Sequence, residues 1–246
     1  MFPIGDDNRD RLHRPIVTYL LIAINLAVFL YLLTLHRSDQ DFFVYQWGVI
    51  PARFTHTAAF QTANPEITSP LYLTLFTAMF LHGGWLHIGG NMLFLWVFGD
   101  NVEDAMGPGR FIIFYLLVGL AGNVAHISFN QSSLAPSLGA SGAIAGVLGA
   151  YIVLKPRGRV RNLIFLGIIF IPLVLPAWIV IGYWFVLQAF NGFVTLGVNF
   201  RSGGASSGGV AYWAHIGGFI AGVVLIKIFT VGRTRIAGYG YRSGLR

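Results

Sequence analysis

The sequence contains no cysteine, and this absence excludes a disulfide framework, a thiol nucleophile and a metal site built from thiolates. Charged side chains are also scarce: they make up 10% of the 246 residues, against about 25% in an average soluble domain. Apolar residues account for 55% of the chain, and its mean hydropathy is +0.68. This composition excludes a disordered chain and argues against an ordinary cytosolic globular protein.

In place of charge, the sequence has long apolar stretches. A helix that crosses a bilayer needs about 20 mostly apolar residues. Glycines in the second of these stretches predict a loop or re-entrant segment in its first third, and prolines in the fifth predict a kink or a shortened helix. We therefore expect an all-α membrane protein, a polytopic bundle of six transmembrane helices. The six stretches cover residues 15–35, 71–98, 111–129, 138–154, 162–190 and 211–229.

The basic residues fall mainly on one side of these stretches. A net charge of +7 would favour nucleic acid as a partner if the basic residues formed one patch. If the N-terminus is cytoplasmic, however, all but Arg37, Arg53 and Arg201 of the 16 basic residues fall in cytoplasmic segments. Such an excess is the pattern that orients membrane proteins. We therefore predict that both termini are cytoplasmic and that nucleic acid is not a partner.

We predict one membrane domain over residues 15–230, between a cytoplasmic N-terminal segment, 1–14, and a basic cytoplasmic tail, 231–246. Two external connections are long. The first, 36–70, contains six aromatic residues, which suit a segment at the bilayer interface, with a plain external loop as the alternative. The second, 191–209, is rich in glycine and serine, and we expect a flexible, lid-like loop there.

Polar side chains within apolar stretches are costly in lipid, so each marks a candidate site. The second stretch carries His82, His87 and Asn91 in LHGGWLHIGGN. His87 and Asn91 are four residues apart and share a helix face, whereas His82 lies off that face or in the preceding loop. Purely structural interhelical hydrogen bonds are one alternative. A metal site is disfavoured, because no HExxH motif, carboxylate at ligand spacing or cysteine accompanies these histidines.

The fourth stretch places a serine near the start of a short helix, in SLGASGAIAG. A serine in a membrane helix is usually a packing residue that bonds to the backbone. Here Gly139 and Gly142 flank Ser141 and permit a tight turn and a close helix contact. The unpaired N–H groups and the positive dipole at a helix start would also stabilise an oxyanion at this position.

The sixth stretch supplies a histidine, His215, in AYWAHIGGFIAG. Gly218 and Gly222 follow it on the same helix face, and such a face of small residues lets two helices pack closely. Docking it on the fourth stretch would bring Ser141 towards His215, so that the pair could act as nucleophile and general base. No aspartate lies within an apolar span to orient the histidine, so we expect a dyad and not a triad. The matching small face on the fourth stretch consists of Ser141, Ala145 and Gly149.

These motifs resemble those of the rhomboid family of intramembrane serine proteases. The resemblance covers about residues 71–229 and rests on HGGWLHIGGN, GASG and AHIGGFIAG, in that order on the second, fourth and sixth stretches. It implies that Ser141 is the nucleophile, that His215 is the base, and that His87, Asn91 and the Ser141 backbone N–H hold the oxyanion. It also implies that the first external loop lies partly in the membrane and that the loop before the sixth helix moves to admit substrate.

Two positions depart from the family pattern. Many members carry an aromatic residue four positions after the nucleophile, which packs on the catalytic histidine. Here that position is Ala145, so we expect another side chain, Tyr212 or Trp213, to hold the His215 ring. Some members also carry a Trp-Arg pair where this chain has Leu and Thr at 73–74, which puts the anchoring of the first loop in doubt.

The resemblance implies an endopeptidase that needs no cofactor and hydrolyses peptide bonds in or near transmembrane segments of other membrane proteins. Its partners would be those substrates and the lipid bilayer, in the inner membrane of a bacterium; the oligomeric state is left open. The alternative is an inactive rhomboid-like protein that binds client helices, although this chain keeps Ser141 and His215. A transporter would need charges near the bilayer midplane, and an aspartyl protease would need two intramembrane aspartates.

Overall fold

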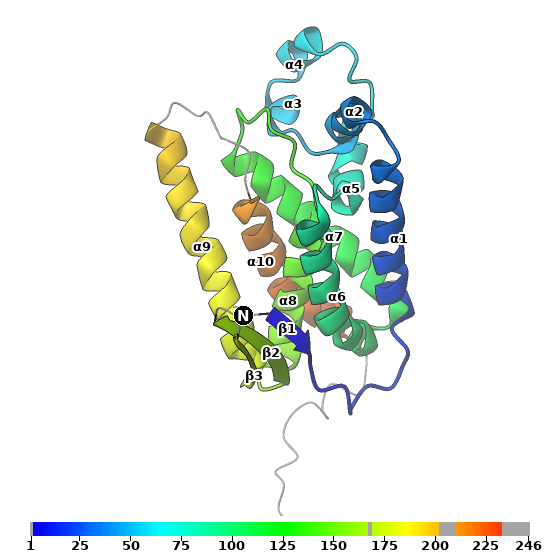
Figure 1. The fold of residues 1–246 in the computed structure, drawn as a ribbon, viewed down its shortest axis with the longest axis vertical. Coiled ribbons are helices and arrows are strands. Elements are labelled where there is room, and N and C mark those ends of the chain that lie inside the picture. The colour runs from blue at the N-terminus through cyan, green and yellow to red at the C-terminus, as the bar shows by residue number, and fades with distance from the viewer. Residues whose placement is uncertain (1, 167–168, 202–209, 233–246) are drawn as a thin grey trace, which may run out of the picture.

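The computed structural model shows a bundle of helices with a small β-sheet at one end and three short helices at the other (Figure 1). It describes residues 2–166, 169–201 and 210–232. Two short 3-10 turns cover Leu71–Leu73 and Ala78–Phe80. The other elements are β1 (Phe2–Gly5), α1 (Ile16–Leu33), α2 (Arg37–Trp47), α3 (Pro51–Thr55), α4 (Thr57–Ala63), α5 (Thr74–Thr77), α6 (Trp85–Met106), α7 (Pro108–Phe129), α8 (Ser141–Leu154), β2 (Arg159–Leu166), β3 (Ile169–Pro176), α9 (Ala177–Arg201) and α10 (Tyr212–Phe229).

Among the described residues, four helices are long and apolar enough to cross a membrane: α1, α7, α9 and α10. The segment Leu71–Phe80 meets α6 at an angle of 83°, and together they make a fifth candidate, either a broken span or a re-entrant loop. Of the four glycines predicted to interrupt this stretch, Gly83 and Gly84 lie at the bend, whereas Gly89 and Gly90 are part of the continuous helix α6. Helix α8 is apolar but has only 14 residues. The mostly helical membrane architecture is thus confirmed, whereas the sixth span stays a prediction.

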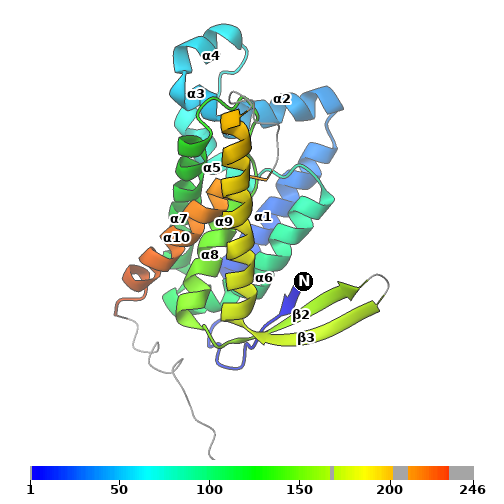
Figure 2. The same cartoon turned by 90° about the vertical axis from the view of Figure 1, so that its left-hand side faces the viewer.

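The fifth apolar stretch is not one helix, so the prediction of a span beginning at residue 162 is wrong in its first half. Strands β2 and β3 form an antiparallel hairpin, and β1 adds to β2 as a third strand (Figure 2). Pro172 and Pro176 would each break a helix, whereas an edge strand such as β3 tolerates proline. The helical part of this stretch, α9, begins directly after Pro176.

Helix α9 also extends further than predicted, and residues 191–201 of the expected lid-like loop are helical. Its polar side chains bond back to the preceding turn, Asn191 Nδ2 to the Leu187 carbonyl and Thr195 Oγ1 to the Asn191 carbonyl, each at 2.8 Å. These bonds satisfy the polar groups without ending the helix. The rest of that predicted loop, 202–209, and the predicted tail from residue 233 lie outside the described residues.

Helix α8 is the buried axis of the bundle, because every residue from Gly142 to Tyr151 is buried. It packs against α6, α7 and α10. Glycine makes the closest of these contacts possible: a Cβ atom on Gly218 would lie 2.0 Å from the Gly142 carbonyl oxygen, and one on Gly222 would lie 2.0 Å from that of Gly146. The backbones of α8 and α10 therefore touch directly, as small-residue faces allow.

The end of α6 that lies near β1 holds the N-terminal segment. The Glu103 carboxylate accepts hydrogen bonds from the backbone N–H groups of Val17 and Thr18. These groups lie in the first turn of α1 and have no acceptor within their own helix. Asp104 accepts from the backbone N–H groups of Leu12 and His13. The two carboxylates thus act as caps for a distant segment, while Arg110 donates to carbonyl groups at the end of α10.

A second group of polar contacts joins the N-terminal segment to α8. Asp6 Oδ2 accepts hydrogen bonds from the Tyr151 hydroxyl, at 2.6 Å, and from Asn101 Nδ2, at 2.7 Å. Lys155 Nζ donates to Asn101 Oδ1 at 2.5 Å. Burial raises the pKa of Asp6 from 3.8 to about 6; the nearby Asp100 adds to this rise, while Tyr151 and Lys155 oppose it.

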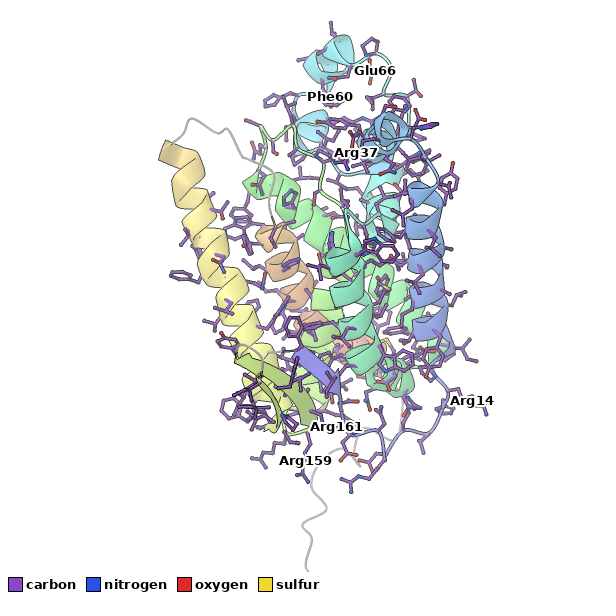
Figure 3. All side chains as sticks on the ribbon, in the orientation of Figure 1. Arg14, Arg37, Phe60, Glu66, Arg159 and Arg161 are labelled. Carbon is purple, nitrogen blue, oxygen red and sulfur yellow. The ribbon has the colours of Figure 1, made fainter. Side chains whose placement is uncertain are left out.

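The basic side chains gather at this same end. Figure 3 places Arg14, Arg159 and Arg161 at the lower end of the bundle, and Arg37 and Glu66 at the opposite end. Strand β1 and the C-terminal end of α10 also lie at the lower end in both ribbon views. The two ends of the described chain are therefore on one side of the bundle. That this side is the cytoplasmic one stays a prediction.

The three helices of the first long connection are anchored without the Trp-Arg pair. Gln46 Oε1 accepts a hydrogen bond from the backbone N–H of Ser69 at 3.0 Å, and the buried Arg53 donates to Ser69 Oγ at 2.9 Å. Val49 and Ser137 exchange two backbone hydrogen bonds, which tie this connection to the loop before α8. The residues 36–70 therefore form an ordered cap over the segment that leads to Ser141.

Replacing Gly222 by Ala should destabilise the bundle by about 1–3 kcal/mol, because the new methyl group would overlap the Gly146 carbonyl oxygen. Thermal unfolding in detergent would measure the change. Gly182→Ala is the matched control on α9, since no atom lies within 4 Å of its Cβ position. Equal stabilities of the two variants would contradict the close contact of α8 with α10.

The unfolding free energy of Asp6→Asn, relative to that of the wild type, should rise as the pH increases from about 4 to 7. The folded chain binds the Asp6 proton more tightly than the unfolded chain, so the wild type loses stability across this window, by at most about 3 kcal/mol. Thermal unfolding at several pH values measures the difference. The control is Asp7→Asn: a hydrogen bond from Arg9 lowers the Asp7 pKa to about 2, so its difference from wild type should stay constant above pH 4.5. A constant difference for Asp6→Asn would contradict the burial of this carboxyl group.

Candidate active site

The structure brings Ser141 and His215 into hydrogen-bond contact. Ser141 is the first residue of α8, and His215 lies in the first turn of α10. His215 Nε2 is 2.8 Å from Ser141 Oγ. The histidine is buried, with 7% of its surface exposed, and the serine is half-buried. The close contact of α8 and α10 one turn further on holds the two residues at this distance.

The other side of the His215 ring faces α9. Gln188 Oε1 is 2.8 Å from His215 Nδ1, and the Trp184 ring lies 5.7 Å from the imidazole, centroid to centroid, at an interplanar angle of 37°. The expected role of Trp213 is wrong, because its indole instead stacks on Phe129 with ring centroids 3.7 Å apart. The side chains that hold the imidazole thus come from a third helix.

Sequence reasoning missed Gln188 and Trp184, although a signal for them existed. Gln188 is a polar residue in the middle of a helix that is otherwise apolar enough to cross a membrane, and such residues mark candidate sites. Trp184 precedes it by four residues and so shares its helix face. The sequence does not show which neighbour this face meets, because that depends on how α9 packs beside α10.

The other predicted site residues lie on or before α6. His87 and Asn91 occupy its first two turns, and His82 lies in the bend that precedes it. Asn91 Nδ2 is 2.9 Å from His82 Nε2, and the rings of His82 and His87 meet edge to face with centroids 5.0 Å apart. His82 therefore contacts both polar residues of the α6 face from the preceding loop.

Gly139 joins this cluster to the serine. It lies two residues before Ser141, has φ = +124°, and donates its N–H to the Ala78 carbonyl at 2.9 Å. A Cβ atom at Gly139 would lie 2.7 Å from His87 Nε2 and 3.6 Å from Asn91 Nδ2. The backbone before Ser141 therefore runs directly over His87 and Asn91, in a conformation that favours glycine.

This arrangement combines an acceptor for a serine proton with donors for an anion. Gln188 Oε1 and Ser141 Oγ lie at the two ring nitrogens of His215, and an imidazole protonated on Nδ1 would present Nε2 to the Ser141 hydroxyl as an acceptor. The side chains of His87 and Asn91 and the first N–H groups of α8 lie around the chain before the serine. Within the described part of the chain, no group of three or more His, Cys, Asp or Glu side chains could hold a metal ion.

The remaining intramembrane polar residues have structural contacts. Asn123 Nδ2 donates to the Leu75 carbonyl at 2.7 Å and so ties α7 to α5. His126 receives a hydrogen bond on its carbonyl oxygen from Asn130 Nδ2 at 2.9 Å. Both contacts fix the upper part of α7 beside the site.

Comparison with known proteins identifies the family. Residues 70–231 match the family model of the Rhomboid domain, which is about two thirds of the chain. The chain therefore belongs to the rhomboid family, and with its candidate spans it is an integral membrane protein. The family includes serine intramembrane proteases, and some of its members are inactive relatives of them.

Three relatives illustrate the similarity. The chain is 35% identical over 146 residues to the rhomboid protease GluP of Bacillus subtilis (strain 168), covering 58% of this chain and 26% of that protein. It is 29% identical over 156 residues to Rhomboid protein 1, mitochondrial, of Saccharomyces cerevisiae, covering 62% and 40%. It is 35% identical over 117 residues to the Presenilin-associated rhomboid-like protein, mitochondrial, of Homo sapiens, covering 46% and 28%.

These matches span between 26% and 40% of the length of the relatives, so they concern the shared membrane domain. Two of the three relatives are mitochondrial and one is bacterial. The prediction of a bacterial inner membrane therefore gains no support from them.

Gly139→Ala should lower the unfolding free energy by about 1–3 kcal/mol, because a methyl group adds backbone strain at φ = +124° and overlaps the His87 ring. Gly83→Ala is the control from the neighbouring bend, where the nearest atom to a Cβ would be Leu138 Cδ1 at 3.8 Å. Thermal unfolding in detergent compares the two. If Gly139→Ala were as stable as the control, His87 would not lie against this turn.

Proposed function

We propose that this protein is an intramembrane serine endopeptidase that hydrolyses peptide bonds in or near transmembrane segments of other membrane proteins. The observation that carries the proposal is the 2.8 Å contact between Ser141 Oγ and His215 Nε2, made at the start of two helices inside an apolar bundle. Membership of the rhomboid family supports the same reaction class.

In this mechanism, His215 Nε2 takes the proton of the Ser141 hydroxyl as Oγ attacks the carbonyl carbon of the substrate peptide bond. The tetrahedral intermediate carries a negative charge on the former carbonyl oxygen. His87, Asn91 and the Ser141 backbone N–H donate hydrogen bonds to that oxygen. Loss of one such donor typically slows an acyl-transfer enzyme by about 10²–10³-fold. Collapse releases the amine, which takes the proton from His215, and leaves an acyl-serine.

Water then hydrolyses the acyl-serine with His215 again as the base, and Ser141 regains its proton. Every step uses side chains of this chain and water, so the proposed reaction needs no cofactor. Because Ser141 lies at the end of α8 that faces the α2–α4 cap, water and the unwound end of a substrate helix would reach it from that side. We assign the opposite end, which carries Arg14, Arg159 and Arg161, to the cytoplasm.

The second candidate is an inactive rhomboid-like protein that binds client helices without cutting them. Its support is Ala145, which replaces the aromatic residue that packs on the histidine in many members. Trp184 contacts the His215 ring and supplies an aromatic neighbour from α9 instead of α8. This contact favours the active enzyme over the inactive binder.

Ser141→Ala should abolish proteolysis and leave the thermal stability within about 1 kcal/mol of wild type, because it removes only the attacking oxygen. Wild type and variant are co-expressed with a panel of single-span membrane proteins, and fragments are detected on gels. In parallel, the purified protein is treated with a fluorophosphonate, which should label wild-type Ser141.

The matched control is Ser128→Ala, because the exposed Ser128 hydroxyl donates to the Val124 carbonyl within its own helix, α7, and makes no other hydrogen bond to the described residues. It should cleave and label as wild type does. Cleavage by Ser141→Ala would refute the proposed nucleophile. A wild-type protein that neither labels at Ser141 nor gives fragments dependent on that serine would instead indicate the inactive binder.

A further inference from the structure

The His215 ring makes contacts to α9 that a Ser-His dyad does not require. Gln188 Oε1 lies 2.8 Å from Nδ1, on the opposite edge of the ring from the Nε2 atom that contacts Ser141. Trp184, four residues before Gln188, packs against the same ring. Side chains from two other helices, α8 and α9, therefore converge on the buried imidazole of α10.

We propose that Gln188 is a positioning residue for His215, whose side-chain carbonyl accepts the Nδ1 proton and fixes the tautomer of the base. The proposal rests on the serine-protease function and deepens it. A neutral imidazole has one donor nitrogen and one acceptor nitrogen, and the partner of one determines the role of the other. With Nδ1 donating to Gln188, the lone pair of Nε2 faces Ser141 and can take its proton.

An amide suits this position better than a carboxylate would. Gln188 lies in a helix that is apolar enough to cross a membrane, and an ionised side chain inside a membrane span is costly. The Gln188 carbonyl supplies a hydrogen-bond acceptor without adding a buried charge. This accounts for a base that is oriented on both edges although no aspartate lies near it among the apolar spans.

Aromatic contacts hold Gln188 in place along α9. Trp184 lies 6.5 Å, centroid to centroid, from Phe94 of α6, and Phe185 stacks on Phe219 of α10 at 4.2 Å and 23°. Phe193, in the next turns, meets Trp213 edge to face at 5.4 Å. These contacts lie on both sides of Gln188 along the helix, so the amide is presented to His215 by a fixed backbone and not by a mobile side chain alone.

The test is the rate at which a fluorophosphonate labels Ser141, measured from pH 5 to pH 9 in detergent. Gln188→Met keeps the shape of the side chain and removes the hydrogen-bond acceptor. If the Met variant does not fold, Gln188→Leu is used in its place. Gln188→Glu keeps an acceptor and adds charge. The matched control, Asn191→Leu, removes an amide one turn later on α9 whose bond, among the described residues, is to the Leu187 carbonyl of its own helix. Thermal unfolding checks the fold of each variant.

We expect Gln188→Met to label about 10- to 100-fold more slowly than wild type, because it leaves the buried Nδ1 donor without a partner and no longer holds the tautomer that activates Ser141. Gln188→Glu should label near the wild-type rate at pH 8. The midpoint of its pH–rate profile should move to higher pH, because a carboxylate favours the protonated imidazole. Asn191→Leu should keep the wild-type rate and midpoint.

The proposal is overturned if Gln188→Met labels at the wild-type rate with the wild-type midpoint, or if it is slowed no more than Asn191→Leu. It is also overturned if Gln188→Glu loses labelling at every pH to the same extent as Gln188→Met, since the acceptor would then not matter. In each of these cases wild-type Ser141 still labels. Failure of the protease function itself would instead appear as no Ser141-dependent labelling in the wild type.

Discussion

The carbonyl oxygens of Gly142 and Gly146 on α8 lie where side chains on Gly218 and Gly222 of α10 would have to be. This backbone contact sets the distance between two helices that carry the candidate catalytic residues on their first turns. Ser141 and His215 are 74 residues apart in the chain, yet their side chains meet at 2.8 Å. In lipid, where apolar side chains gain little by leaving the surrounding solvent, such close packing is the main source of helix association.

The contacts around His215 show how a departure from a family pattern is compensated. A residue on α8 four positions after the serine would pack on the imidazole from the nucleophile's own helix, but Ala145 is too small to do so. Trp184 and Gln188 approach the ring from α9 instead. The orientation of His215 therefore depends on where α9 stands, and α9 is fixed by the aromatic contacts of Trp184 and Phe185 to α6 and α10.

Sequence reasoning reached the helical membrane fold and the approach of Ser141 to His215, because hydropathy and small-residue spacing are local signals that lipid enforces. It failed at residues 162–176, because the hydropathy of an apolar run is the same whether the run forms a strand or a helix. The hairpin is decided partly by β1, whose Phe2 pairs with Leu163. It also failed at Gln188, because spacing gives the helix face of this residue but not the helix that the face packs against.

The length of helix α8 accounts for the depth of Ser141 within the bundle. Its 14 residues rise only about 21 Å, less than the roughly 30 Å of a hydrocarbon core. One end is held by the hydrogen bond from Tyr151 to Asp6 and by Lys155, next to the N-terminal segment. The other end, at Ser141, must then lie below the level reached by the longer α7 and α10. The loop that leads to it passes over His87 and is covered by the α2–α4 cap. A short central helix anchored at one end thus places the proposed nucleophile inside the bundle and leaves access to it from the opposite side.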